Sequence, residues 1–93
     1  MSYITLTANE TNTVIAQCYA MLARCYYALN YEAVASDAKE SIQHIQQLQA
    51  DVANNCVTTE ALFRVAELTD NSGDDSAIAN DFFAIYNKYD RKN

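Results

Sequence analysis

The chain has 93 residues and a mass of 10.4 kDa, which suffices for a single small domain over residues 1–93 with one modest core. It contains 51% hydrophobic residues, one glycine and no proline, a composition that favours helix throughout and predicts an all-α fold. The formal charge of -6 and the pI near 4.4 disfavour nucleic acid and anionic membranes as partners, because their phosphate groups would be repelled.

The first predicted helix covers residues 8–28, after an N-terminal segment (1–7) that we expect to be flexible. Thr7 and Glu10 have the spacing of a capping box. Apolar and aromatic residues then occupy most of the circumference of the helix, as follows: Val14, Ile15, Cys18, Tyr19, Met21, Leu22, Cys25, Tyr26, Tyr27 and Leu29. A helix that is apolar on nearly every side needs cover on nearly every side, so we expect another molecule to dock on it.

The second predicted helix covers residues 31–52 and has the pattern of an ordinary amphipathic surface helix. Asn30 can either end the first helix or cap the second. The apolar residues form one stripe: Val34, Ala38, Ile42, Ile45, Leu48 and Val52.

Two shorter helices complete the chain. Asn54 and Asn55 break the helical pattern, and Thr58 or Thr59 caps a third helix over residues 59–70. A turn follows, and Asp74 or Asp75 caps a fourth helix. Its core stripe consists of Ile78, Phe82, Ile85 and Tyr89, and residues 90–93 are expected to be a flexible end.

A degenerate internal repeat links the first and third helices. Residues 19–26 and 62–69 lie 43 positions apart and share a pattern of large and small residues. The matched positions are Tyr19, Leu22, Ala23 and Tyr26 in the first copy, and Leu62, Val65, Ala66 and Thr69 in the second. The small residues Ala23 and Ala66 are expected to let a neighbouring helix backbone approach closely.

This repeat resembles the tetratricopeptide motif, which implies a four-helix antiparallel array of helical hairpins. The chain departs from that motif because it has no terminal proline and because its copies lie 43 residues apart rather than about 34. Together with its small size and acidity, the pattern is similar to the tetratricopeptide-like chaperones that hold the needle subunit of bacterial type III secretion. The resemblance implies a non-enzymatic chaperone that binds an amphipathic helix of the needle subunit, with a second small helical co-chaperone, and prevents premature polymerisation.

The same resemblance implies a concave binding surface built from first-helix positions of the two repeats. Tyr27 and Phe63 would be its aromatic anchors, and Arg24 would clamp a carboxylate or a helix C-terminus. The implied set consists of Gln17, Ala20, Arg24, Tyr27, Ala28, Phe63, Glu67 and Asp70.

No catalytic or metal site is expected. Asp37, Ser41 and His44 fall on one face of the second helix, but one helix face supplies neither an oxyanion hole nor a pocket. The stretch 70–75 lacks the spacing of a calcium loop, and one histidine with three scattered cysteines makes no zinc set, so we expect no cofactor. The cysteines are expected to be small core residues of a cytoplasmic protein, because Cys18 and Cys25 lie too far apart along one helix to pair and no secretion signal or membrane span is evident.

Two alternatives of other classes remain. The charge of -6 is compatible with an acidic inhibitor that blocks a nucleic-acid-binding enzyme. The surplus apolar surface of the first helix is also compatible with a self-associating helical bundle.

Overall fold

The computed structural model describes residues 3–71 and 76–90, and the structure in these ranges consists of helices without strands. The helices are α1 (Ala8–Ala28), α2 (Glu32–Ala53), α3 (Thr59–Asp70) and α4 (Ser76–Asp90). The predicted all-α class is confirmed, as are the predicted ranges of α1 and α3, while α2 begins and ends one residue later than expected. The expected cap of α4 at Asp74 or Asp75 lies outside the described residues.

Side-chain caps explain where two of the helices begin. At the start of α1, the Thr7 hydroxyl accepts a hydrogen bond from the Glu10 amide (3.1 Å), and the Thr7 amide donates to the Glu10 carboxylate (2.8 Å), which completes the predicted capping box. At α3, the Thr58 hydroxyl accepts from the Ala61 amide at 3.1 Å. Thr58 is therefore the cap, and Thr59 is the first helical residue.

Asparagines end the two long helices. The Asn30 side-chain amide donates to the Tyr27 carbonyl (3.1 Å), whereas Tyr31, which occupies the cap of α2, makes no side-chain capping bond, so Asn30 closes α1. Asn55 has a φ of 55°, and the Cys56 amide donates to the Asp51 carbonyl at 2.9 Å. This is the left-handed geometry that closes a helix with a Schellman motif, and asparagine tolerates it better than most residues.

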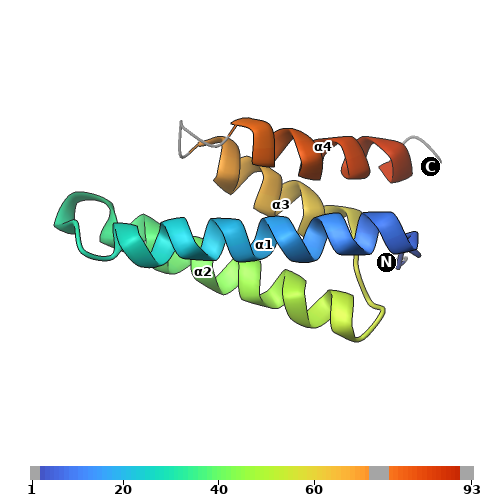
Figure 1. The fold of residues 1–93 in the computed structure, drawn as a ribbon, viewed down its shortest axis with the longest axis horizontal. Coiled ribbons are helices and arrows are strands. Elements are labelled where there is room, and N and C mark those ends of the chain that lie inside the picture. The colour runs from blue at the N-terminus through green and yellow to red at the C-terminus, as the bar shows by residue number, and fades with distance from the viewer. Residues whose placement is uncertain (1–2, 72–75, 91–93) are drawn as a thin grey trace.

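The helices form two antiparallel hairpins, α1–α2 and α3–α4, that pack on one another (Figure 1). Contacts run around the bundle, because α1 packs on α2 and α4, and α3 packs on α4 and α2. The bundle measures 40 × 23 × 23 Å. The largest fully buried side chains lie between the hairpins and come from all four helices: Val14, Cys18, Ile45, Leu48, Leu62, Val65, Thr69 and Phe82.

The two copies of the internal repeat do not pack alike. Ala66 is fully buried, as expected for a small residue under a neighbouring helix. Ala23 is exposed, so the helix expected to approach it closely is not one of the described helices of this chain. The reason is that Leu22 and Cys25 take the buried positions of this turn, which directs Ala23 outward.

A polar cluster, here called the end clasp, ties the start of α1 to the end of α4. Glu10 accepts a hydrogen bond from the Lys88 ammonium at 2.7 Å, and the Tyr89 hydroxyl is shared between the Glu10 carboxylate and the Thr5 carbonyl. Burial by itself would raise the pKa of Glu10, but the hydrogen bonds from Lys88, Tyr89 and the Thr7 amide outweigh it and lower the pKa to about 2.

Residues 3–7, which belong to the N-terminal segment that the sequence predicts to be flexible, make further contacts through their backbone. The Ile4 amide donates to the Val57 carbonyl at 2.8 Å, and the Thr5 carbonyl is within 2.9 Å of the Tyr89 hydroxyl. Residues 91–93 of the predicted C-terminal end lie outside the described residues. Among the helices described, none combines the length and apolarity needed to cross a lipid bilayer.

Candidate functional site

Unequal helix lengths leave one end of the bundle partly uncovered. At about 1.5 Å per residue, α1 and α2 are each over 30 Å long, whereas α3 is about 18 Å and α4 about 22 Å. The α1–α2 hairpin therefore projects beyond α3 and α4, at the end that carries its connecting turn (Figure 1, left). Side chains of this projection that would otherwise be buried lack the cover of the other hairpin.

A concave surface lies where the projection begins, and we call it the hairpin groove. Its volume is about 680 Å³, within the range of roughly 300–1,000 Å³ that is typical of ligand-binding pockets. Three buried side chains, Met21, Cys25 and Ala38, form an apolar floor. The residues that line the groove come from three helices and the residue that follows α3: Met21, Arg24, Cys25 and Ala28 of α1, Val34, Asp37, Ala38, Glu40 and Ser41 of α2, Leu68 of α3, and Asn71 after it.

Charged side chains border this apolar floor. Arg24 lies on the α1 side, and Asp37 and Glu40 lie on the α2 side, and all three are exposed. A floor of apolar side chains with charges at its border matches the surface of an amphipathic helix, which has an apolar stripe between polar flanks.

Aromatic residues extend the site toward the turn between α1 and α2. The Tyr27 and Tyr31 rings are 5.3 Å apart, and their hydroxyl oxygens are 2.7 Å apart. The hydrogen bond with Tyr27 raises the pKa of Tyr31, with a further contribution from desolvation, so the Tyr31 phenol stays neutral at physiological pH. Both rings are exposed, and Val34, which is 43% exposed, lies in the first turn of α2 beside the groove.

The structure gathers only part of the predicted binding set. Arg24 and Ala28 line the hairpin groove, and Tyr27 stands near its outer end. Gln17 donates a hydrogen bond to Asp81 of α4 at 2.5 Å, so its amide joins two helices within the chain. Ala20 is half-buried against the core and does not line the groove.

The predicted residues of α3 lie elsewhere. The Phe63 ring is 6.0 Å from the Phe83 ring and 5.0 Å from the Tyr86 ring, so it packs on α4. Phe63 belongs to the first half of α3, toward the end of the bundle opposite the α1–α2 turn, and it is not brought together with Tyr27 (Figure 1). Glu67 and Asp70 are exposed beside the groove residues Leu68 and Asn71 but do not line it.

Sequence reasoning missed the contribution of α2 to the groove. Val34, Asp37 and Ser41 line it, although α2 was expected to be an ordinary scaffold helix. The signal that could have found them is the difference in length between the first two helices and the last two, which leaves the first turns of α2 only partly covered by the other hairpin.

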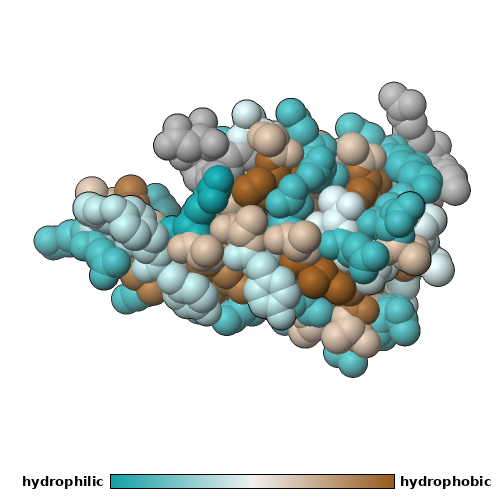
Figure 2. All heavy atoms as spheres, viewed as in Figure 1, coloured by the Kyte–Doolittle hydropathy of each residue, from teal (hydrophilic) through white to brown (hydrophobic). Residues whose placement is uncertain are grey.

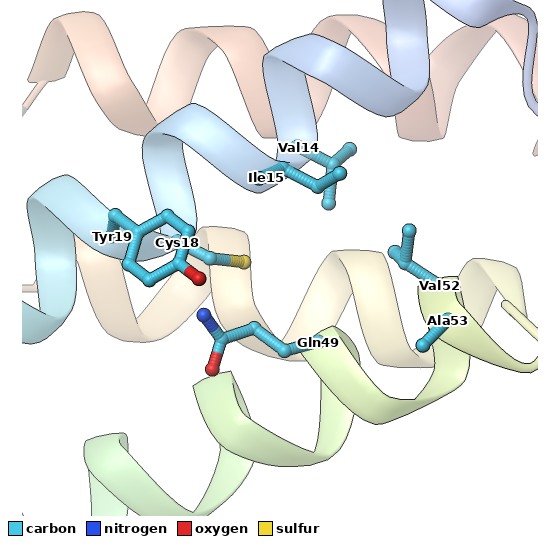
Figure 3. Close-up of a pocket in the computed structure, with 7 residues that line it drawn as sticks. All are labelled: Val14, Ile15, Cys18, Tyr19, Gln49, Val52 and Ala53. Atoms are coloured by element: carbon cyan, nitrogen blue, oxygen red, sulfur yellow. The ribbon is translucent and has the colours of Figure 1, made fainter.

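A second, smaller concave surface lies on a different face, between α1 and α2. Figure 2 shows brown and tan residues along α1 across the middle of this face. The lateral hollow, as we call it, has a volume of about 210 Å³, and Figure 3 shows the residues that line it. They are Val14, Ile15, Cys18 and Tyr19 of α1, and Gln49, Val52 and Ala53 of α2.

The lateral hollow offers packing rather than reactive chemistry. Val14 and Cys18 are fully buried and form its floor, while Ile15 and Tyr19 are exposed at its border. Burial raises the pKa of the Cys18 thiol to about 12, so this sulfur is protonated at neutral pH and is a poor nucleophile.

No arrangement suited to metal binding occurs within residues 3–71 and 76–90, where no three His, Cys, Asp or Glu side chains converge. Of the three polar residues that share a face of α2, Asp37 and Ser41 line the hairpin groove and His44 does not.

Fold and site thus define a small helical protein with an apolar groove at the projecting end of one hairpin. No family model, no curated protein and no solved structure matches the chain.

Proposed function

We propose that this chain is a non-enzymatic chaperone or adaptor that holds an amphipathic helix of a partner protein in the hairpin groove. Following the resemblance of the sequence, we propose a needle-type subunit of type III secretion as the partner, held in the cytoplasm before export. The observation that carries the proposal is the groove of about 680 Å³ at the projecting end of the α1–α2 hairpin, with its buried apolar floor.

The chemistry of the groove suits such a helix. Apolar side chains spaced three or four residues apart on the partner would pack on Met21, Cys25 and Ala38, and would be removed from water. Polar side chains that flank this stripe would face Arg24 on one border and the carboxylates of α2 on the other. A subunit that polymerises through apolar helix surfaces could not do so while one of these surfaces is covered, which is the effect required of a chaperone.

Val34 provides a sharp test, because it lines the groove and yet is 43% exposed, so its replacement leaves the core intact. A fluorescent peptide that corresponds to the amphipathic C-terminal helix of a needle-type subunit is titrated with the wild type and with Val34→Asp. We expect the variant to bind at least about tenfold more weakly, because an unpaired carboxylate would lie against the apolar side of the bound helix.

Ala33→Asp is the matched control. It adds the same charge to the same turn of α2, at an exposed residue that does not line the groove, and it should bind as the wild type does. Equal weakening by both variants, or by neither, would contradict binding in the hairpin groove. Binding that disappears on a modest increase in salt would instead support the acidic inhibitor, because only a charge-dominated interface is screened so strongly.

A further inference from the structure

The outward side of α1 is largely exposed, and within it the Tyr26 hydroxyl accepts a hydrogen bond from the Gln46 side-chain amide of α2 at 3.2 Å. Five exposed residues share it, and together we call them the α1 outer face: Ile15, Ala16, Tyr19, Ala23 and Tyr26. Tyr19 is 64% exposed, Tyr26 50% and Ile15 39%, which is unusual for three large side chains on one helix face. Figure 2 shows this part of the surface as a band of tan, brown and pale residues along α1.

The α1 outer face is uncharged in a strongly acidic protein. Between Glu10 and Glu32 the sequence contains a single charged residue, Arg24, and that residue lines the hairpin groove on another side of the helix. In a two-fold symmetric pair each face meets its own copy, so any charge on the face would lie near an identical charge. The α1 outer face is therefore a surface that two molecules of charge -6 can bring together without placing like charges in contact.

We propose that a second copy of this chain docks on the α1 outer face, with the two α1 helices antiparallel. Ala23 would lie close to the two-fold axis, where its small side chain lets the two backbones approach. Tyr26 lies seven residues beyond Tyr19, or about 10.5 Å along the helix, on the side of Ala23 away from the lateral hollow. With the axis at Ala23, position 26 of one molecule lies opposite position 20 of the other, so each Tyr26 ring packs beside Tyr19 of the other molecule.

The exposed area predicts a weak dimer. With about 200 Å² per aromatic side chain, the exposed parts of Tyr19 and Tyr26 amount to about 230 Å². The other members of the face bring the patch to on the order of 400 Å² per molecule, or about 800 Å² for the pair, below the usual range of stable interfaces. A dimer of this size exchanges with its monomers in the micromolar range or above. Because Arg24 and the hairpin groove lie on another side of α1, the dimer would present two open grooves.

The test is sedimentation velocity of the whole chain from about 10 µM to about 500 µM, a range that brackets a weak association constant. We expect the weight-average sedimentation coefficient of the wild type to rise with concentration, and to do so at least as strongly at high salt as at low salt, because salt screens the repulsion between two acidic molecules. Tyr19→Glu should remain monomeric over the whole range, because a carboxylate would be buried against the apolar face of the other copy. Ala23→Glu, at the proposed axis, should do the same.

Tyr3→Glu is the matched control, since Tyr3 is 66% exposed and lies outside α1. It should dimerise as the wild type does, and circular dichroism should show equal helix content in all variants. A wild type that stays monomeric throughout, or equal effects of Tyr3→Glu and Tyr19→Glu, would overturn the proposal. So would a dimer that Val34→Asp abolishes and Tyr19→Glu does not, because the hairpin groove would then be the contact between copies.

Discussion

The end clasp supports a quantitative prediction, because one carboxylate receives most of its hydrogen bonds. In the folded chain the pKa of Glu10 is about 2, against an ordinary value of 4.5. The carboxylate therefore stabilises the fold fully above pH 4.5, and this contribution is lost as the pH falls toward 2. The full difference corresponds to about 3.4 kcal/mol, but the Lys88 side chain is 48% exposed and solvent screens its charge, so we expect about 1–2 kcal/mol.

Glu10→Gln removes the charge and keeps the shape of the side chain. At pH 7 the variant should lose about 1–2 kcal/mol of unfolding free energy, or about 5–10 °C in Tm for a domain of this size. Urea unfolding followed by circular dichroism measures the unfolding free energies of the wild type and the variant at pH 7 and at pH 3. The difference between wild type and variant should shrink at pH 3, because Glu10 with its ordinary pKa of 4.5 is then largely protonated in the unfolded chain but still ionised in the folded chain, which stabilises the unfolded state of the wild type.

Glu60→Gln provides a matched control, since Glu60 also lies in the first turn of a helix but is exposed. It should change stability by less than about 0.5 kcal/mol. If Glu10→Gln were as stable as the wild type at pH 7, or if the gap between them were the same at both pH values, the reasoning about the end clasp would be refuted.

Three further predictions concern the cap, the core and a cysteine. Thr58→Ala should cost about 1 kcal/mol in urea unfolding because it removes the α3 cap, whereas Thr59→Ala should cost less than half of that; the reverse order would contradict the capping assignment. Phe82→Ala should cost about 3–5 kcal/mol, because Phe82 is fully buried between the hairpins, and a loss below about 1 kcal/mol would contradict that burial. Cys18 should resist iodoacetamide at pH 8 in the folded chain and react in urea, as peptide mass spectrometry can show; fast labelling of Cys18 without denaturant would contradict its burial and its raised pKa.

Local sequence signals predicted helix boundaries well. The capping box at Thr7 and Glu10 and the cap at Thr58 act within one turn of chain, so the residues that determine them are adjacent in sequence. The same holds for the break at Asn55, where the left-handed backbone is a property of one residue and its neighbours. Asn30 was left with two possible roles, because only the hydrogen bond to Tyr27 distinguishes the end of one helix from the start of the next.

Relations between distant elements were predicted less well. Ala23 and Ala66 occupy equivalent places in the repeat, yet one is exposed and the other buried, since burial depends on which helix lies opposite. For the same reason the repeat could not show that Phe63 packs on α4 while Tyr27 pairs with Tyr31 at the hairpin turn. The helical periodicity of a sequence identifies which face of a helix is apolar. Which other helix covers that face depends on the lengths and crossing geometry of the helices.

The end clasp also has a practical consequence for anything joined to this polypeptide. The end clasp holds the first turn of α1 beside the last turn of α4. The N-terminal and C-terminal ends of the chain therefore lie at the same end of the bundle, and the α1–α2 turn lies at the opposite end (Figure 1). An affinity handle, a fluorophore or an adjoining domain would thus be anchored about 20–30 Å along α1 from the groove residues Met21 to Ala28. Molecules immobilised through either terminus would present the hairpin groove outward, toward whatever is supplied in solution.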